Sequence, residues 1–178
     1  PEYIGKRSRA SSIGKMAGEL MKLEEESELS DRIDVSANGD EVIIRLSEAG
    51  FFDSGKAEIR PDALPAFQII GERLETFEGI EITAQGHTDN RPIKTARFRS
   101  NRELSTGRAN AVIRLLEENH QKIEPASLVS AGYGEYRPLA PNDNGSGRAR
   151  NRRVDVVVRP MANDAIRLRR QQAGQTEP

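Results

Sequence analysis

The sequence predicts an α+β protein: a two-layer α/β sandwich with one mixed sheet, two main helices on one face and an additional N-terminal helix. Three observations predict this class. A strand–turn–strand pattern around residue 38 is followed by alternating helical and strand patterns. Each helical pattern has an apolar stripe on one side only, so each helix must bury that side against another element. The 178 residues are enough for one such domain with extensions.

The N-terminal segment predicts a helix from about Ser11 to Ser30. Its apolar residues recur at spacings of three and four and form a narrow seam: Ile13, Met16, Leu20 and Leu23. Two interpretations stay open, because two heptads do not establish a coiled coil. The helix lies on the surface of the domain, or it is a dimer helix or a linker to a segment outside this sequence.

A hairpin is predicted next, with strands over residues 33–37 and 42–46. Asn38-Gly39 between them tolerates the positive φ angles of a tight turn. Phe51 and Phe52 then begin a loop, and we expect both rings to anchor it in the core.

A second helix is predicted from about Pro61 to Phe77, followed by a strand over residues 80–84. Pro61 suits the first turn of a helix, whereas Pro65 moves the expected start later. This helix has one apolar stripe at helical spacing: Leu64, Phe67, Ile70, Leu74 and Phe77.

The third helix has the clearest start, because Ser100 and Glu103 form a capping-box pattern. A last pair of strands is predicted over residues 128–131 and 154–158, separated by a loop over residues 132–147 that is rich in Gly, Pro and Asn. The expected buried stripe of the third helix consists of Ala109, Val112, Ile113 and Leu116.

The composition excludes several classes of protein. The chain has 27 Lys and Arg against 28 Asp and Glu, and this near-neutral balance argues against nucleic-acid binding. It has no cysteine, which excludes disulfides and thiolate metal sites. No apolar run is long enough to span a bilayer, and no signal peptide is visible. Because the sequence begins with Pro1 rather than Met, we expect a processed or shortened form of a longer chain.

The candidate site lies between residues 86 and 109, where an acidic and a basic residue stand on either side of a loop. Asp89 comes at the end of the predicted strand, and Arg108 lies on the third helix. At about 100° per residue, Asn101, Leu104 and Arg108 line one flank of that helix. We therefore expect a shallow pocket for a zwitterion, with Asp89 binding an ammonium and Arg108 a carboxylate. Asn101 adds an amide, Leu104 an apolar wall and Thr88 a hydroxyl.

A simpler interpretation competes with the pocket. Asp89 and Arg108 can form an exposed salt bridge that only ties the loop to the helix, which is worth about 1 kcal/mol or less. Gly107, just before Arg108, costs roughly 1 kcal/mol relative to Ala inside a helix. We expect it to allow close packing, and clearance for a ligand is the alternative.

Catalysis is not expected, and neither is a metal or a cofactor. His87 precedes Asp89 by two residues, but a catalytic zinc needs three protein ligands and no spacing completes the set. A triad of Ser105, His87 and Asp89 has no nucleophile elbow to support it. We expect His87 to be a structural residue at the strand end.

Two further motifs are assigned no ligand. Arg152 and Arg153 precede the last strand and are expected to be strand-edge charges in water. Pairing with acidic loops, or an extension of the ligand surface, is the alternative. Gly145-Ser146-Gly147 lacks the lysine and the spacing of a phosphate-binding loop, so a nucleotide site is not expected.

Several ordered motifs resemble the OmpA-like C-terminal domain, over about Val42 to Arg159. The motifs are Phe52-Asp53-Ser54-Gly55-x-Ala57-x-Ile59, Gly86-His87-Thr88-Asp89, Asn101-x-x-Leu104-Ser105-x-x-Arg108-Ala109, Gly132-Tyr133-Gly134 and Asn151-Arg152-Arg153-Val154. The resemblance implies non-catalytic binding of peptidoglycan through the diaminopimelate of its stem peptide. It thereby favours the pocket over the simple salt bridge. The ligand residues of the family map onto these positions: Asp89, Arg108, Asn101 and Leu104, with Thr88 adjacent.

Within that family the loop resembles the stator B subunits of flagellar motors, the MotB and PomB group. The matching residues are Thr88-Asp89-Asn90-x-Pro92-Ile93 and Phe98-x-Ser100-Asn101-x-Glu103-Leu104-Ser105. This resemblance implies a dimeric wall anchor in the periplasm, tied to the inner membrane and to the stator A subunit by a transmembrane helix outside this sequence. An outer-membrane or lipoprotein anchor with the same domain is the first alternative, and a cell-wall hydrolase is the second.

The expected organisation has three parts. Residues 1–32 form a linker and helical segment, residues 33–160 the OmpA-like domain, and residues 161–178 a C-terminal tail. The tail has a basic cluster of Arg167, Arg169 and Arg170 and is expected to fray.

Overall fold

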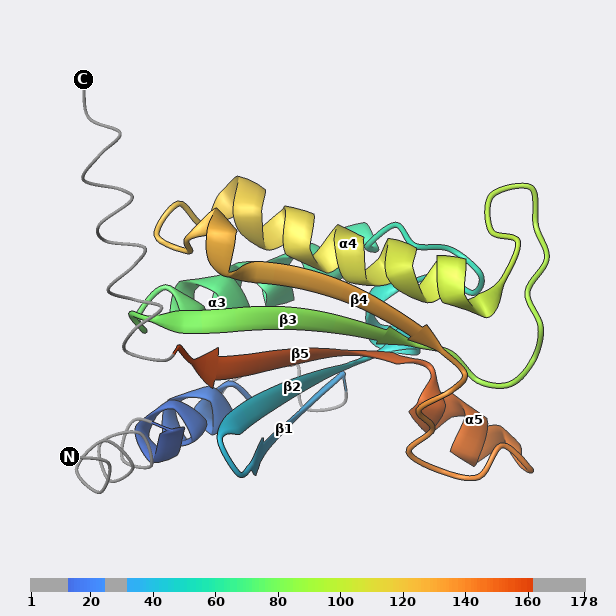
Figure 1. Cartoon of the computed structure of the whole chain (residues 1–178), viewed down its shortest axis with the longest axis horizontal. Coiled ribbons are helices and arrows are strands. Elements are labelled where there is room, and N and C mark those ends of the chain that lie inside the picture. Colours follow the sequence, from blue (N-terminus) through green and yellow to red (C-terminus); the bar gives the residue numbers. More distant parts are fainter. Residues whose placement is uncertain (1–12, 25–31, 162–178) are drawn as a thin grey trace.

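The sheet has five strands, and their order in space differs from their order along the chain. The computed structural model describes residues 13–24 and 32–161. The strands lie in the order β1-β2-β5-β3-β4 (Figure 1). β5 pairs antiparallel with β2 and β3, whereas β3 and β4 are parallel, so the sheet is mixed as predicted. The bounds are β1 Ile33–Asn38, β2 Glu41–Ser47, β3 Ile80–His87, β4 Leu128–Gly134 and β5 Arg153–Pro160.

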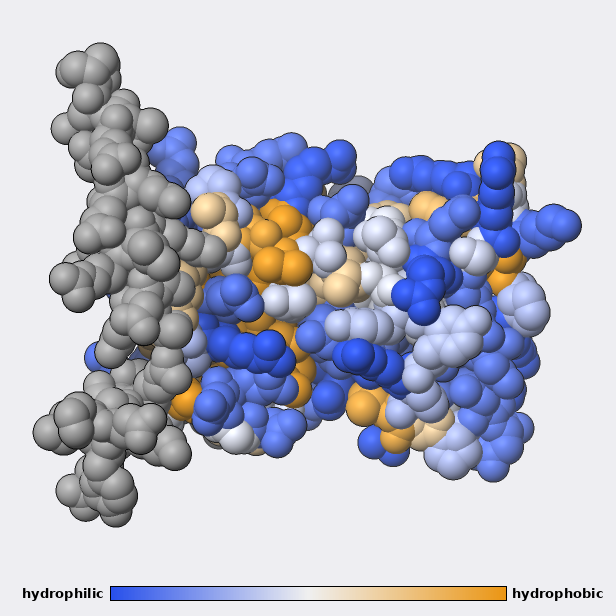
Figure 2. All heavy atoms as spheres, viewed as in Figure 1, coloured by the Kyte–Doolittle hydropathy of each residue, from blue (hydrophilic) through white to orange (hydrophobic). Residues whose placement is uncertain are grey.

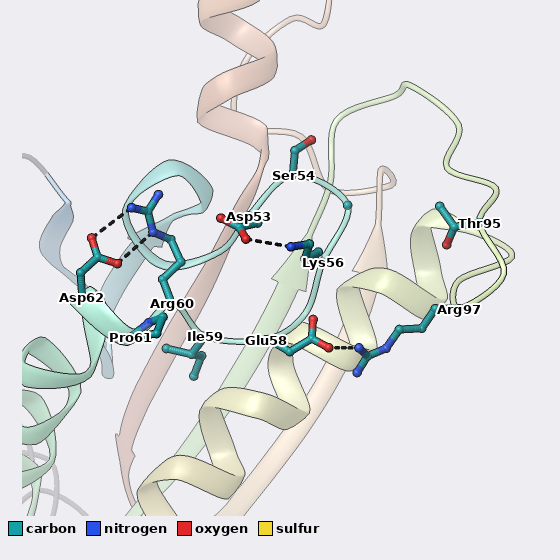
Figure 3. Close-up of a pocket in the computed structure, with 11 residues that line it drawn as sticks. Asp53, Ser54, Lys56, Glu58, Ile59, Arg60, Pro61, Asp62, Thr95 and Arg97 are labelled. Carbon is teal, nitrogen blue, oxygen red and sulfur yellow. Dashed lines mark hydrogen bonds and ion pairs between the residues drawn. The ribbon is translucent and has the colours of Figure 1, made fainter.

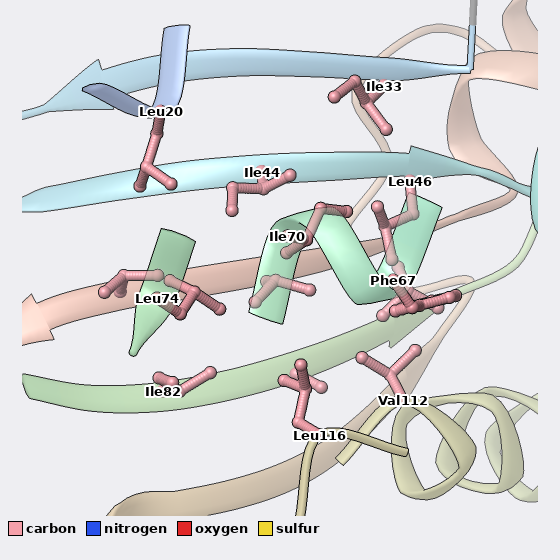
Figure 4. Close-up of a cluster of buried hydrophobic side chains, with 14 of the residues drawn as sticks. Leu20, Ile33, Ile44, Leu46, Phe67, Ile70, Leu74, Ile82, Val112 and Leu116 are labelled. Atoms are coloured by element: carbon pink, nitrogen blue, oxygen red, sulfur yellow. The ribbon is translucent and has the colours of Figure 1, made fainter. Parts of the chain in front are cut away.

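Three helices cover one face of this sheet, as the predicted two-layer sandwich requires. They are the N-terminal helix over residues 13–24, α3 (Leu64–Leu74) and α4 (Asn101–Asn119). Figure 4 shows their apolar side chains, such as Leu20, Ile70 and Leu116, gathered against the strands. None of the helices in the described part of the chain is long and apolar enough to cross a bilayer.

The N-terminal helix packs into the core of the domain. All four residues of its apolar seam are at most 7% exposed and belong to the same cluster as the strands: Ile13, Met16, Leu20 and Leu23. Glu24 Oε2 also accepts a hydrogen bond from Val35 N of the edge strand β1 at 3.2 Å. Of the two interpretations, the structure therefore supports the helix lying on the domain. Residues 25–30 of the predicted helix lie outside the described residues, as does the arginine cluster of the tail.

The predicted hairpin is confirmed, with a small change in its turn. Asn38 pairs with Glu41, so Gly39 and Asp40 are the two turn residues. Gly39 has a φ of +60°, while no residue other than glycine has a positive φ in the described part of the chain. A positive φ at the first turn position alone is the signature of a type II′ turn.

The second predicted helix begins later than its pattern suggested. Residues Pro61–Ala63 form a 3₁₀ turn, and α3 starts at Leu64 with Pro65 in its first turn, as Pro65 led us to expect. The prediction that Leu64 is buried is wrong, because it is 44% exposed while Ala63 and Ala66 are buried instead. Leu64 is the first residue of α3, and Ala63 of the preceding 3₁₀ turn takes the buried position at that end of the stripe.

Glycines bring α4 unusually close to the sheet. A Cβ at Gly86 of β3 would lie 2.0 Å from the Ser105 carbonyl oxygen, and one at Gly132 of β4 would lie 2.0 Å from Thr106 Oγ1. The N-terminus of α4 is capped as predicted, since Ser100 Oγ accepts a hydrogen bond from the backbone N of the third helical residue at 3.2 Å. These contacts fix the helix flank that faces the candidate site.

Two short helices, and the positions of the last two strands within the sheet, were not predicted. α2 (Glu48–Phe51) replaces the start of the expected loop, although Phe51 and Phe52 are buried as expected. α5 (Gly145–Asn151) follows the Gly-rich loop, and the last two strands along the chain are not neighbours in the sheet. Over the surface seen in Figure 2, hydrophilic residues dominate and hydrophobic ones are confined to a few patches.

Candidate functional site

One pocket gathers all five residues that the sequence assigned to ligand binding. It has a volume of about 470 Å³. Glu48 and Arg152, which were not assigned to a ligand, also line it. The five predicted residues in its lining are Thr88, Asp89, Asn101, Leu104 and Arg108.

The register of the sheet brings Glu48, Asp89 and Arg152 together. The last residues of β2 and of β3 both pair with Arg153, the first residue of β5. These two strands therefore end at the same edge of the sheet, where β5 begins. The chain then continues beyond the sheet, and Glu48 N donates to the Arg152 carbonyl oxygen at 3.0 Å. Side chains from three distant parts of the sequence therefore meet at this edge.

Arg108 is almost fully buried beneath the pocket, with 1% exposure. Its Nε donates to Lys56 O at 2.8 Å, and its Nη2 donates to Glu48 Oε1 at 2.5 Å and to Asp53 O at 3.3 Å. The guanidinium carbon lies 5.2 Å from the centre of the Phe52 ring. Burial lowers the pKa of Arg108, and the Glu48 carboxylate opposes this shift. An arginine stays charged in proteins even so. Arg108 Nη1 has no hydrogen bond to the described residues, so this nitrogen remains for a group in the pocket.

Four charged side chains alternate across the site. Glu48 accepts hydrogen bonds from Arg108 with one carboxylate oxygen and from Arg152 Nε with the other. Arg152 Nη1 donates in turn to Asp89 Oδ2 at 2.8 Å. We call this series, Arg108–Glu48–Arg152–Asp89, the charge chain. Partial burial lowers the pKa of Arg152, but its bonds and charge interactions with Asp89 and Glu48 outweigh burial and raise that pKa above its ordinary value.

The charge chain corrects two expectations. Asp89 and Arg108 do not pair directly, because Arg152 and Glu48 stand between them. The expectation that Arg152 and Arg153 are strand-edge charges in water is wrong, and the alternative of pairing with acids holds. Arg153 is 4% exposed, and its Nε donates to Asp155 Oδ2 at 2.9 Å. Arg153 is the first residue of β5, a strand that lies between two others, which hides it from water, whereas Arg152 precedes the strand and keeps 33% exposure.

Asn101 closes the loop that follows β3. Its Nδ2 donates to Arg91 O at 3.1 Å and to Asp89 O at 3.3 Å, and its Oδ1 accepts from Ile93 N at 3.2 Å. Nδ2 also donates to the Glu135 carboxylate. The amide is thus occupied within the protein. It shapes the loop that carries Asp89, whose Oδ1 accepts from Arg91 N at 2.9 Å.

Leu104 and Thr88 complete the walls of the pocket. Leu104 is 5% exposed and packs in a small apolar cluster with Ala57 and Phe98. A Cβ at Gly107 would lie 3.0 Å from the Phe98 ring, which confirms that this glycine allows close packing. Thr88 Oγ1 donates to the carbonyl oxygen of the next residue at 2.9 Å, so it tightens the turn that presents the carboxylate.

His87 and Ser105 do not form a catalytic arrangement. Ser105 Oγ donates to Arg102 O at 2.9 Å and accepts from Gly134 N at 2.9 Å, so it joins α4 to β4. Neither ring nitrogen of His87 has a hydrogen-bond partner among the described residues. Across residues 13–24 and 32–161 no three His, Asp or Glu side chains are grouped to hold a metal ion.

His87 is instead a buried neutral side chain at the end of β3. It is 2% exposed and stacks on Tyr133, with 5.4 Å between ring centres. Burial first, and then the positive charges of Arg153, Arg137 and Arg45, lower its pKa to about 3. Its imidazole is therefore uncharged at neutral pH, as the prediction of a structural residue requires.

A larger hollow of about 860 Å³ lies beside the site, and Figure 3 shows its residues. Its charged side chains form local pairs between exposed neighbours, which contribute little stability and offer no free charge. None of the five predicted ligand residues lines it. The pairs are Lys56–Asp53, Arg60–Asp62 and Arg97–Glu58.

Sequence reasoning missed the two central members of the charge chain. Arg152 lies in a motif that the sequence did mark, but its environment was misjudged. Glu48 lies in no motif, and its only signal is its position two residues after the strand predicted over residues 42–46. An acid at that point becomes informative only once the strand pairing is known.

Comparisons with known proteins agree with this geometry. The family model described as "OmpA family" matches residues 51–152. Motility protein B of Bacillus subtilis is 34% identical over 155 residues, which cover 87% of this chain and 59% of that protein. The chain therefore spans little more than half the length of this relative.

Solved structures related to MotB share the fold. A MotB-like protein from Desulfovibrio vulgaris superposes with a TM-score of 0.80 at 26% identity, covering 87% of this chain and 98% of that chain. The periplasmic domain of Helicobacter pylori MotB (its residues 78-256) superposes with a TM-score of 0.68 at 25% identity, covering 82% of this chain and 93% of that chain.

Proposed function

Because this chain belongs to the OmpA family, we propose that its pocket binds the diaminopimelate of peptidoglycan stem peptides and thereby anchors a flagellar motor stator to the cell wall. The chain is an OmpA-like peptidoglycan-binding domain related to MotB. Proteins of this family are non-catalytic, so the chain is not a wall hydrolase.

The chemistry of the pocket supports diaminopimelate as the group that is bound. Its side chain ends in a zwitterion, with an ammonium and a carboxylate on one carbon. Asp89 supplies the anion for the ammonium, and Arg108 Nη1 supplies a donor for the carboxylate. Leu104 lies beside the aliphatic carbons. The observation that carries the proposal is this pair of opposite charges, 6% and 1% exposed, at one pocket. Charged groups in such places bind partners more strongly than charges on an open surface.

The stator role rests on the likeness to motility proteins and on the stator-like loop. The relatives that support it are the motility protein B of Bacillus subtilis and the periplasmic MotB domain of Helicobacter pylori. We propose the same periplasmic location for this domain and attachment to the inner membrane by a helix outside this sequence. The partners we propose are a second copy of the chain and the stator A subunit.

Binding is tested by pull-down with purified sacculi that contain diaminopimelate. Asp89→Asn removes one charge without changing the shape of the side chain, and we expect about a tenfold or greater loss of bound protein, as for a charge-assisted hydrogen bond. Asp143→Asn is the matched control, since Asp143 is exposed and lies outside the pocket. Equal binding of wild type and both variants would refute the pocket assignment.

The second candidate function is an outer-membrane or lipoprotein anchor with the same wall-binding domain. The family match over residues 51–152 supports this function as well as the stator role, because the matched family is described as "OmpA family" and names no motor. The sequence upstream in the full-length gene separates the two. A transmembrane helix with a buried aspartate supports the stator, whereas a β-barrel or a lipidated cysteine supports the outer-membrane anchor.

A further inference from the structure

The two ends of the charge chain are the two groups that the proposed ligand needs. Arg108 lies at one end and Asp89 at the other, and in this structure both are already paired. Glu48 gives Arg108 a carboxylate, and Arg152 gives Asp89 a cation. Glu48 and Arg152 are also bonded to each other. Together they place an internal carboxylate and an internal cation where the ligand's own charges bind.

Burial explains why such an internal pair is present. The side chains of Asp89 and Arg108 are only 8% and 1% exposed. A charge this far from water is costly unless an opposite charge and hydrogen bonds compensate it. Without Glu48 and Arg152, the ligand-free site would hold a buried anion and a buried cation that lack these partners.

The members of the charge chain differ in how firmly they are held. Arg108 is fixed by the carbonyl oxygens of Lys56 and Asp53 in addition to Glu48. Arg152 is 33% exposed, against 11% for Glu48. Among the residues that the structure describes, its side chain forms hydrogen bonds only to the two acids of the charge chain. Arg152 is therefore the member of the charge chain that is most accessible to water, and it binds Glu48 and Asp89 through two different nitrogens.

We propose that Arg152 is an affinity-determining residue of this site, which occupies Asp89 in the ligand-free protein and gives way to the ammonium of the bound ligand. The inference rests on the proposed function, because it takes diaminopimelate as the ligand. The exchange leaves every buried charge compensated: Asp89 by the ligand ammonium, Arg108 by Glu48 and the ligand carboxylate, and Arg152 by Glu48 and water. Arg152 thus competes with the ligand and lowers its affinity.

The test compares the affinity of wild type and variants for the tripeptide L-alanyl-γ-D-glutamyl-meso-diaminopimelate by isothermal titration calorimetry. Arg152→Gln removes the competing cation but keeps a polar side chain, and we expect the Kd to fall by about two- to fivefold, the range of a partly exposed ion pair. Arg150→Gln is the matched control, because it removes an exposed charge two residues away that lines no part of the pocket. An unchanged or higher Kd for Arg152→Gln overturns the proposal, and so does an equal fall in the control.

A second measurement uses the wild-type protein and does not depend on how a variant folds. The NMR signal of the Arg152 Nε–H group reports the environment of this side chain during titration with the same tripeptide. We expect it to shift on saturation, while the Arg108 Nε–H signal, tied to a backbone carbonyl, shifts less. No change at Arg152 in the presence of bound tripeptide overturns the proposal.

Asp89→Asn distinguishes this inference from the proposed function. If Asp89→Asn binds the tripeptide as tightly as wild type, the pocket assignment itself fails. If Asp89→Asn loses binding but Arg152→Gln binds the tripeptide no more tightly than wild type, the pocket assignment is supported and only the competition by Arg152 is refuted.

Discussion

Replacing Gly86 by alanine tests whether the glycine of β3 exists to let α4 approach the sheet. The added Cβ would lie 2.0 Å from the carbonyl oxygen of Ser105, 2.7 Å from its carbonyl carbon and 3.0 Å from its Cα. All three are backbone atoms of a helix, so no side-chain rotation relieves the clash. α4 must move away from the sheet by about 1 Å or more to restore van der Waals contact.

Two effects set the size of the loss. Overpacking of a filled interior costs about 1–3 kcal/mol, and a clash with helix backbone belongs at the upper end. Alanine lowers the entropy of the unfolded chain, which raises the free energy of unfolding by about 0.4–1 kcal/mol. We therefore expect the free energy of unfolding to fall by about 2 kcal/mol and the Tm to fall by roughly 4–8 °C. Because Asn101, Leu104 and Arg108 all lie on α4, the affinity for sacculi should fall as well.

The assay is urea unfolding followed by circular dichroism, together with the sacculus pull-down. Gly145→Ala is the matched control, since a Cβ at Gly145 meets nothing within 4 Å. The control should be as stable as wild type or slightly more stable. If Gly86→Ala is as stable as the control and binds sacculi as well, then close approach of α4 is not the reason for glycine at this position.

Two further predictions concern the buried histidine and the N-terminal helix. His87 has a folded-state pKa of about 3 against an ordinary 6.5, so its neutral form stabilises the fold above pH 6.5, and this contribution is lost as the pH falls toward 3. At about 1.4 kcal/mol per pH unit, the free energy of unfolding of wild type should fall by about 3 kcal/mol between pH 6.5 and 4 because of this residue. Urea unfolding of His87→Phe should therefore show a shallower pH dependence than that of wild type. Equal slopes for the two proteins would contradict the burial argument. Leu20 is 0% exposed, so Leu20→Ala should cost about 2–5 kcal/mol in urea unfolding. Met21→Ala, at a position 40% exposed, should cost far less, and equal losses would mean that the helix does not belong to the core.

Local patterns predicted the elements of this fold well. Asn38-Gly39 marked the hairpin, Ser100 with Glu103 marked the start of α4, and Pro65 marked the delay of α3. Each signal depends on residues within four positions of one another, where backbone preference and capping act directly. The burial of Leu64 was mispredicted because Ala63, in the 3₁₀ turn before it, takes the buried position at the start of the stripe. α5 was missed because its sequence, from Gly145 to Asn151, has no apolar stripe.

The N-terminal helix marks the limit of what a pattern can decide. Its seam of Ile13, Met16, Leu20 and Leu23 is visible in the sequence, and any apolar surface of matching shape can bury it. A second chain and the domain itself were equally good partners on that evidence. The structure places the seam in one hydrophobic core cluster with residues of β1, β2 and α3.

The sequence by itself determined which side chains of the candidate site come from the loop after β3 and from the flank of α4. Asp89, Asn101, Leu104 and Arg108 lie within one loop and one helix, so their placement follows from local geometry. Only the tertiary structure decided how the charges pair. Arg152 binds Asp89 across 63 positions of sequence and Glu48 across 104, because antiparallel pairing ends β2 and β3 beside the start of β5. Such strand pairing depends on long-range packing, which no local pattern specifies.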